Sequence, residues 1–301
     1  MNKSAVVTGA AGFAGIHLTE RLLEKDYRVL AVLRPASEHN ARIDALFARF
    51  PEGRLKTLVL DRDRELLSES LSEEGADYGS FFDLAWGGGR EDIRAQLANL
   101  LRTQDAVAAA KKLGCRRFIG IGSQAEYGLK TEPVTEKSLT EPFSAYGAAK
   151  LAACHLSRIA AAQAGLEWIW GRIFSLTGRY EAAGRMLPDL VRKMEKGETA
   201  QLSSCEQYWD YLDAGDCAEA LIALSERGRS GEIYNIAHGG YRPLKEYVEE
   251  LRRELKLPGG IVYGGKAEPF VNLMPVVSKL KADTGWEPRV SFTESVRSID
   301  V

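Results

Sequence analysis

Short apolar runs alternate with longer amphipathic segments over the first two-thirds of the chain. Turn-forming residues flank the short runs, which predicts strands, while the longer segments carry apolar residues at helical spacing. The predicted strands are Ala5–Thr8, Arg28–Leu33, Leu55–Leu60, Phe81–Ala85, Arg117–Ile121 and Leu166–Phe174, and the predicted helices are Gly12–Lys25, Ser37–Phe50, Gly89–Leu113 and Ala145–Ala164. This alternation is typical of a parallel sheet with helices on both faces.

The alternation becomes less regular after residue 175. Helices are predicted at Arg185–Lys196, Ala214–Glu226 and Leu244–Leu255, a strand at Glu232–Ile236, a polar stretch at Gly197–Gln207 and a Gly/Pro-rich tail at the end. We therefore expect an α/β protein with a doubly wound Rossmann domain over residues 1–175. Residues 176–301 are expected to form mostly a smaller C-terminal α/β substrate-binding lobe, with some segments returning to the Rossmann domain.

Composition narrows the class of protein. The chain has 301 residues, of which 45% are hydrophobic, and its formal net charge is −2, so a basic surface for nucleic acid is not expected. The first apolar run breaks at Thr8 and is too short for a signal peptide or a membrane span. The four cysteines form no CxxC pair and do not group with the four histidines, which leaves a metal site without support. We expect a cytoplasmic protein with reduced thiols and no membrane partner.

A glycine-rich segment, Thr8-Gly9-Ala10-Ala11-Gly12-Phe13-Ala14-Gly15, joins the first predicted strand to the first helix. Glycines there let the backbone turn tightly and approach a pyrophosphate, and the helix N-terminus offers free N–H groups to it. The spacing is GxxGxxG rather than GxGxxG, so position carries the argument, and a plain turn is the alternative. We expect Gly9, Gly12, Phe13 and Ala14 to bind a dinucleotide cofactor.

The end of the second strand favours NADP over NAD. An acidic residue there accepts from the ribose 2′-hydroxyl, whereas an arginine pairs with a 2′-phosphate. The chain has Leu33-Arg34 at this point and no carboxylate, although Arg34 is open to the alternative of a solvated surface residue. Asp61, after the third strand, could reach the adenine or could be the N-cap of a helix beginning at Arg62.

The candidate chemistry lies in Ser123, Tyr146 and Lys150. Tyr146 and Lys150 are four residues apart on one predicted helix face. A neighbouring ammonium stabilises a phenolate, so Tyr146 can exchange a proton with a carbonyl or alcohol oxygen while Ser123 holds that oxygen. Tyr241 and Lys245 repeat the spacing, but Pro243 lies between them.

Together these segments resemble the extended short-chain dehydrogenases/reductases, in the NAD-dependent epimerase/dehydratase branch that acts on nucleotide sugars. The resemblance runs over nearly the whole chain and adds Leu84-Ala85-Trp86, Asn99, Arg172-Ile173-Phe174-Ser175, Gly231–Ile236 and Gly285-Trp286-Glu287-Pro288. It implies that Leu84, Ala85, Trp86, Asn99 and Phe174 contact the cofactor together with Tyr146 and Lys150. It also implies that the substrate meets Trp86, Ser123, Gln124, Ala125 and Ser175, with Arg185 as a candidate for its diphosphate.

Departures from the family pattern narrow the reaction. Dehydratases resemble one another in having Thr-Asp-Glu where this chain has Ser123-Gln124-Ala125, and an amide and a methyl group cannot replace those carboxyl groups in proton transfer. Ser175 stands where the family often has Asn, and Trp209 where it often has Arg. Trp209 either stacks on the substrate or packs in the core.

We therefore expect an NADPH-dependent 4-ketoreductase acting on a nucleotide-linked 4-keto-6-deoxy sugar. The alternatives are a 4-epimerase that retains NAD, a reductase of a non-sugar carbonyl, and a non-catalytic cofactor-binding protein. The resemblance also implies a homodimer joined by a four-helix bundle from helices at 90–113 and 144–165. Alanine-rich faces would permit close approach there, unless they cover the chain's own sheet; these alanines are Ala106, Ala108, Ala109, Ala152, Ala153, Ala160 and Ala161.

Overall fold

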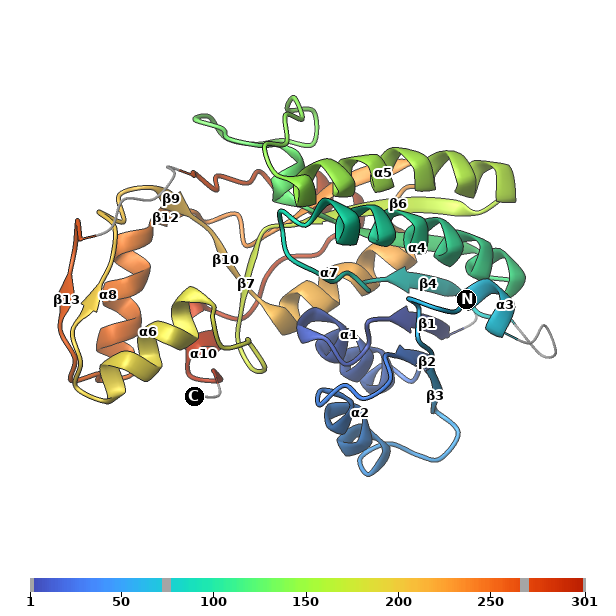
Figure 1. The fold of residues 1–301 in the computed structure, drawn as a ribbon, viewed down its shortest axis with the longest axis horizontal. Coiled ribbons are helices and arrows are strands. Elements are labelled where there is room, and N and C mark those ends of the chain that lie inside the picture. Colours follow the sequence, from blue (N-terminus) through green and yellow to red (C-terminus); the bar gives the residue numbers. More distant parts are fainter. Residues whose placement is uncertain (1–2, 72–76, 266–270, 300–301) are drawn as a thin grey trace.

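The computed structural model describes residues 3–71, 77–265 and 271–299. Its centre is a seven-stranded parallel sheet in the order β11-β6-β5-β4-β1-β2-β3 (Figure 1). The strands are β1 (Ser4–Thr8), β2 (Arg28–Leu33), β3 (Leu55–Val59), β4 (Ser80–Asp83), β5 (Arg117–Ser123), β6 (Glu167–Ile173) and β11 (Glu232–Ile236). The order reverses between β1 and β4, so the sheet has the switch point of a doubly wound Rossmann fold and the predicted fold class is confirmed.

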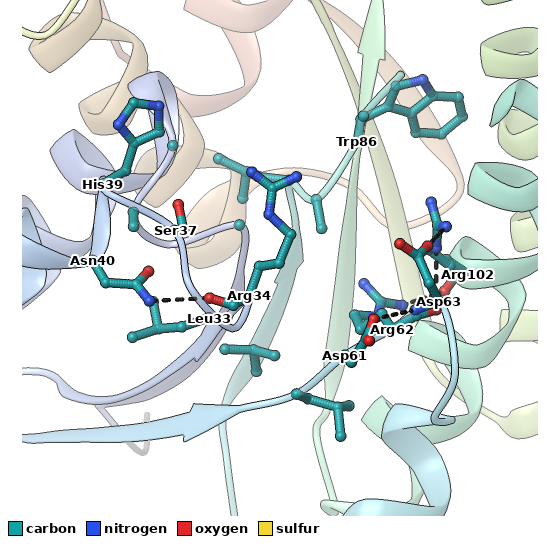
Figure 2. A pocket seen from close by; sticks show the side chains of 18 of the residues that line it. Leu33, Arg34, Ser37, His39, Asn40, Asp61, Arg62, Asp63, Trp86 and Arg102 are labelled. Atoms are coloured by element: carbon teal, nitrogen blue, oxygen red, sulfur yellow. Dashed lines mark hydrogen bonds and ion pairs between the residues drawn. The ribbon is translucent and has the colours of Figure 1, made fainter. Parts of the chain in front are cut away.

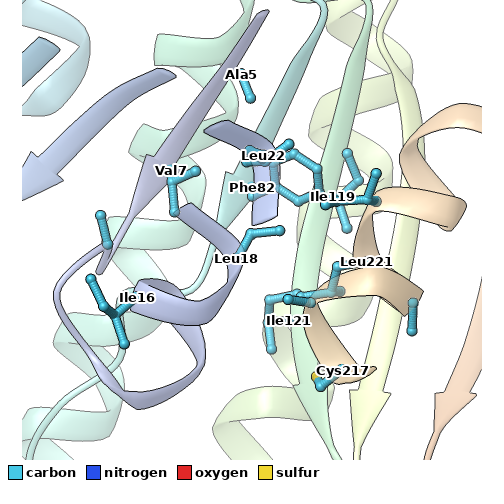
Figure 3. Packing of buried hydrophobic residues seen from close by; sticks show 14 of the residues in the cluster. Ala5, Val7, Ile16, Leu18, Leu22, Phe82, Ile119, Ile121, Cys217 and Leu221 are labelled. Atoms are coloured by element: carbon cyan, nitrogen blue, oxygen red, sulfur yellow. The ribbon is translucent and has the colours of Figure 1, made fainter. Parts of the chain in front are cut away.

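Helices cover both faces of this sheet because its strands are apolar on both sides. Val7 of β1 packs with α1 (Phe13–Glu24), α2 (Asn40–Phe47) and α7 (Ala214–Arg227), as Figure 3 shows for Leu18, Leu22 and Leu221. Val6, which points the opposite way, packs with α3 (Leu67–Ser70), α4 (Ile93–Lys112) and α5 (Ala145–Ala164). The helix α9 (Ser278–Thr284) packs against α7 and β11.

A second group of elements lies at the opposite end of the molecule from β3 (Figure 1). It comprises the helices α6 (Met186–Glu195), α8 (Leu244–Glu254) and α10 (Phe292–Val296) and the short strands β8 (Ala200–Gln201), β9 (Tyr208–Trp209), β12 (Arg242–Pro243) and β13 (Ile261–Val262). These elements share their own apolar cluster, in which Leu190, Val248 and Val296 are buried. The strands β7 (Ser175–Thr177) and β10 (Tyr211–Asp213) pair in parallel between this group and the main sheet.

The sequence pattern misses several short elements. The helix α3, the 3-10 turn η1 (Gln124–Glu126) and the paired strands β7 to β10, β12 and β13 are too short to show a periodicity. The tail, predicted as Gly/Pro-rich, contains α9 and α10, and the polar stretch 197–207 contains β8. Ser291 and Glu294 form a capping box at the start of α10, which is a signal that the sequence does contain.

No helix in the described ranges is long and apolar enough to cross a membrane.

Candidate active site

The glycine loop after β1 is shaped by close backbone packing. Gly9 has φ +66°, and a Cβ atom there would stand 3.0 Å from the backbone of Ala85. A Cβ on Gly15 would lie 2.0 Å from the carbonyl oxygen of Gly9, so the first turn of α1 packs directly on the loop. The Gly12 N–H donates to that same oxygen at 2.9 Å, and Gly12 precedes α1. The loop therefore brings the N-terminus of α1 to the carboxyl edge of the sheet.

A cavity of about 320 Å³ opens beside this loop (Figure 2). It lies where β1, β2, β3 and β4 end, at the switch point of the sheet. Eight of the residues predicted to bind a cofactor line it: Gly9, Gly12, Arg34, Asp61, Leu84, Ala85, Trp86 and Asn99. The glycine loop and the apolar strand ends fit a dinucleotide, since Gly9 and Gly12 present backbone without a side chain to the cavity.

The exposed side chain of Arg34 extends over the cavity from the loop after β2 (Figure 2). Ser37 and His39 line the same side of the cavity, and Asn40 donates to the Arg34 carbonyl oxygen at 3.0 Å. The last residue of β2 is Leu33, so no carboxylate stands at the strand end. This side of the cavity offers a cation, a hydroxyl and an imidazole, which are suited to a phosphate group.

Arg62 and Arg102 form the other polar side of the cavity, and sequence reasoning missed both. Arg62 lies 3.7 Å from Asp83 and donates to the carbonyl oxygen of Arg102, yet its buried Nε and Nη1 atoms have no hydrogen-bond partner in the described part of the chain. Arg102 pairs with Asp63 and donates to Asn99. Arg62 and Arg102 come from elements far apart in the sequence, so spacing gave no indication that they meet.

Asp61 and Asn99 line the cavity, and their side chains also form hydrogen bonds within the protein. Asp61 accepts from the backbone N–H of Asp63 at 3.2 Å in a turn, and no helix begins at Arg62, so the N-cap alternative is wrong. Asn99 is buried and exchanges two hydrogen bonds with Gly87, at 2.7 and 3.2 Å. Its amide therefore holds the loop after β4 in place along the cavity wall.

Ser123, Tyr146 and Lys150 do not line this cavity. Tyr146 and Lys150 contact Trp86, which does line it, and Ser123 is hydrogen-bonded to Tyr146. Ser123 ends β5, while Tyr146 and Lys150 lie in the first turns of α5. The ring of Tyr146 meets Trp86 edge-on at 6.2 Å between centroids. The Lys150 ammonium lies 3.7 Å from the centroid of Trp86 and donates to the Ile121 carbonyl oxygen at 2.5 Å. Trp86 thus contacts both titratable groups and is itself held by a 2.8 Å hydrogen bond to Gln96.

Burial sets the protonation states of this site. It lowers the pKa of Lys150 to about 8, against the opposing charges of Asp83 and Glu126. Burial also raises the pKa of Tyr146, although a hydrogen bond with Ser123 and the charge of Arg90 act in the other direction. Tyr146 is therefore a neutral phenol at neutral pH, in the form that can donate a proton.

Other residues predicted to contact the substrate or the cofactor lie on η1 and at the start of β7. Gln124 and Ala125 form η1 directly after Ser123, and Ala125 is buried. Ser175 begins β7. Phe174 packs against Tyr127, with 6.3 Å between ring centroids, and does not line the cavity described above.

Phe13 and Ala14 also lie outside the lining of that cavity. Phe13 packs edge-on against His17, and the exposed guanidinium of Arg185 lies 6.0 Å from its ring centroid. Arg185 is close enough to lower the pKa of Tyr146 by its charge, against the dominant effect of burial.

Trp209 and the second Tyr-x-x-x-Lys match belong to the smaller group of elements. Trp209 packs against two apolar clusters, in agreement with the packing alternative. Tyr241 packs edge-on against Tyr208, while Lys245 lies beyond Pro243 in α8. Tyr241 and Lys245 therefore do not share one helix face.

Comparisons with known proteins agree with this geometry. A model described as the NAD dependent epimerase/dehydratase family matches residues 5–237. The chain belongs to the NAD dependent epimerase/dehydratase family. As a member of this family it is an NAD(P)-dependent enzyme of the extended short-chain dehydrogenase/reductase type.

Relatives within the family carry different activities. The chain is 26% identical to the GDP-6-deoxy-D-mannose reductase of Pseudomonas aeruginosa, over 99% of this chain and 96% of the relative. It is 24% identical to the dTDP-6-deoxy-L-talose 4-dehydrogenase (NAD(P)(+)) of Kitasatospora kifunensis, over 97% of this chain and 93% of the relative.

Solved structures share the fold over nearly the whole chain. UDP-glucuronic acid 4-epimerase from Bacillus cereus, in complex with UDP-glucuronic acid and NAD, matches with a TM-score of 0.85 at 23% identity, covering 98% of this chain and 97% of that one. RMD from Pseudomonas aeruginosa, complexed with NADPH, matches with a TM-score of 0.77 at 22% identity, covering 98% and 96%.

Proposed function

We propose that this enzyme reduces the C4 keto group of a nucleotide-linked 4-keto-6-deoxy sugar with NADPH. The observation that carries the proposal is the contact of Tyr146 and Lys150 with Trp86, a residue that lines the same cavity as Arg34. Ser123 is hydrogen-bonded to Tyr146. A proton donor for a carbonyl oxygen thus lies next to a cavity that offers a cation for a 2′-phosphate. A reductase of the 4-keto sugar uses both.

The residues present fit a nicotinamide dinucleotide, with the glycine loop at its pyrophosphate and Arg34 at its 2′-phosphate. When bound, NADPH supplies a hydride to the C4 carbon. Ser123 holds the carbonyl oxygen by a hydrogen bond, and Tyr146 donates its proton to that oxygen as the alcohol forms. Protonated Lys150 stabilises the resulting phenolate by its charge.

Gln124 and Ala125 argue against dehydration. Elimination of water needs a carboxylic acid and a carboxylate at these two positions, and this chain has an amide and a methyl group there. A reductase needs only the three groups above.

A 4-epimerase with retained NAD is the second candidate. The likeness to the UDP-glucuronic acid 4-epimerase in complex with NAD favours it. Arg34 favours the reductase, because a 2′-phosphate partner is of use to an enzyme that exchanges NADPH in each turnover. The names of the two curated relatives, which are both enzymes of 6-deoxy sugars, support the same choice. A reductase of a non-sugar carbonyl would use the same three groups on a different substrate.

The substrate's diphosphate would meet Arg185 and Arg90. The guanidinium of Arg90 lies 4.7 Å from the ring centroid of Tyr146, and both arginines act on the pKa of that residue. They therefore place positive charge beside the proton donor, where an anionic substrate has to bind.

We also propose that the enzyme is a homodimer through α4 and α5, with a corrected contact surface. Four of the seven alanines named for this contact are fully buried against the chain's own sheet, namely Ala106, Ala109, Ala153 and Ala161. The outward faces instead expose large apolar side chains, namely Ile93, Leu97 and Leu101 on α4 and Leu156 and Ile159 on α5. Because α4 and α5 pack side by side, a second copy can cover both stripes as a four-helix bundle.

A panel of nucleotide-linked 4-keto-6-deoxy sugars, incubated with the enzyme and NADPH, tests the reaction through loss of absorbance of the reduced cofactor. We expect one sugar to consume NADPH stoichiometrically, and Tyr146→Phe to lower kcat by about 100- to 10,000-fold. Tyr241→Phe is the matched control and should keep wild-type activity. If no sugar consumes NADPH while UDP-sugar isomers interconvert, the epimerase replaces the reductase. If the enzyme binds NADPH but acts on no nucleotide sugar, the non-sugar carbonyl is favoured.

A further inference from the structure

Directly behind Ser123 lies a carboxylate that the reaction above does not use. Glu126 ends η1, and its side chain is fully buried. One carboxylate oxygen accepts from the Ser123 backbone N–H at 2.8 Å and from the Trp170 indole at 3.0 Å. The other accepts from Nε of Arg172 at 2.7 Å. Three donors from three strand positions thus converge on one buried anion, which fixes it in place.

Two glycines of the strand β5 leave space for this carboxylate and for the Trp170 ring. A Cβ atom on Gly122 would stand 2.4 Å from the Glu126 carboxylate and 2.1 Å from the Trp170 indole nitrogen. A Cβ on Gly120 would stand 2.3 Å from the Trp170 ring. Both glycines have ordinary backbone angles, so only the space on this face of the strand requires them. The two glycines of Gly120-Ile121-Gly122-Ser123 therefore leave the space that Trp170 and Glu126 occupy next to the strand.

The charge of Glu126 also reaches the two titratable groups of the site. Burial lowers the pKa of Lys150, and the charges of Asp83 on β4 and of Glu126 act against that effect. At Tyr146, burial and Glu126 both raise the pKa, whereas Arg90 and Arg185 act in the opposite direction.

The partner of Glu126 has its own place in this network. Burial lowers the pKa of the Arg172 guanidinium, but the attraction of Glu126 outweighs that effect and the pKa is raised, so Arg172 keeps its charge. Its guanidinium lies 4.4 Å from the ring centroid of Tyr127, away from the cavity.

We propose that Glu126 is a positioning residue of the reaction, which fixes the backbone of Ser123 and supports the positive charge of Lys150. The proposal rests on the proposed function, because Ser123 and Lys150 matter only if a carbonyl oxygen is reduced there. Ser123 is both the cap of η1 and the hydrogen-bond donor to the substrate. A carboxylate that holds its N–H determines where its hydroxyl points.

Glu126→Gln tests this proposal with minimal change of shape. A carboxamide has one acceptor oxygen for three donors, so the segment at Ser123 must shift. We expect kcat to fall by about 100-fold, as for small displacements of catalytic groups, with KM near its wild-type value. The loss of activity at alkaline pH should begin at lower pH, because Lys150 loses a supporting charge. Glu136→Gln is the matched control, since Glu136 accepts the backbone N–H of Asn235 at 2.9 Å away from the site.

A double variant separates positioning from stability. Glu126→Gln alone leaves Arg172 buried without a counter-ion and can unfold the chain. Combining it with Arg172→Met removes that unpaired cation, so we expect thermal stability to recover while kcat stays low. If kcat returns to the wild-type value in the folded double variant, the pair is only structural and the proposal is overturned.

A measurement without substrate keeps this test independent of the proposed reaction. In protein labelled with [ε-¹³C]lysine, the Lys150 signal is the one missing in K150R. The pH at the midpoint of the titration of this signal is expected near 8 in the wild type. It should move to lower pH in E126Q and stay unchanged in E136Q. An unchanged midpoint in E126Q contradicts the proposal, even if no nucleotide sugar is reduced. A shifted midpoint in an enzyme that reduces no such sugar refutes the proposed function and leaves the action of Glu126 on Lys150 in place.

Discussion

Replacing Arg34 with alanine should weaken NADPH binding and leave NADH binding unchanged. Arg34 lines the cavity beyond the end of β2, and no carboxylate stands at that strand end. In NADPH the guanidinium would pair with the 2′-phosphate, whereas in NADH it would face a neutral hydroxyl. The substitution therefore separates two cofactors that differ only in the group beside this side chain.

The size of the effect follows from exposure. A hydrogen bond to a charged group contributes about 1.5 to 3 kcal/mol. Arg34 is exposed, so solvent screens the pair and the lower value applies, which corresponds to about a tenfold rise in the Kd for NADPH. The effect should shrink at high salt.

Fluorescence titration of NADPH and NADH on wild-type and variant enzyme measures this change. Arg253→Ala is the control: it removes the same charge from an arginine of α8 that is 71% exposed and lies outside the cavity lining. If Arg34→Ala weakens both cofactors equally, or has no larger effect on NADPH than Arg253→Ala, then Arg34 does not select NADP and the preference for a reductase loses its main support.

Three further changes test other parts of the structure. Activity should fall as pH rises through about 8, where Lys150 loses its proton. Trp86→Leu removes the ring that stabilises the ammonium, so the fall should move to lower pH by about one unit. The pH profile of kcat measures this shift, and an unchanged alkaline midpoint in the variant contradicts the prediction. Leu101→Glu places a charge at a side chain of α4 that is 70% exposed, and light scattering should then show a monomer in place of the dimer. Val59→Glu, at an exposed side chain of β3, is the control and should leave the dimer intact. A wild-type monomer at micromolar concentration would refute the dimer. Gly15→Ala should abolish cofactor binding or lower the Tm, since its Cβ would lie 2.0 Å from a backbone oxygen, and wild-type affinity and Tm would show that the loop can relax.

The sequence predicts the Rossmann part of this fold well because its strands are buried on both faces. The run Ala5–Thr8 and the helix that follows carry their patterns over enough residues to be recognised, and both lie close to the predicted bounds. The strand β5 extends two residues beyond the predicted end at Ile121, to Ser123, because Gly122 and Ser123 pair with β6. That pairing is tertiary and leaves no local signal.

The site is predictable where motif and position coincide and fails where distant residues meet. Gly9, Tyr146 and Lys150 follow from local spacing, whereas the approach of Arg62 to the cavity depends on how two separate elements pack. The pairing of Glu126 with Arg172 joins the turn η1 to the strand β6 in the same way. The alanines of α4 and α5 illustrate the opposite error, since a small side chain fits equally against the chain's own sheet or against a second copy.

The transfer of deuterium from NADPH labelled at C4 of the nicotinamide tests the central claim most directly. With the sugar that the panel identifies, the account predicts one molecule of NADPH consumed per product and deuterium at C4 of the product sugar. Interconversion of sugar isomers without consumption of NADPH, and without deuterium in the product, would contradict the reductase and assign the site to an epimerase that retains its cofactor.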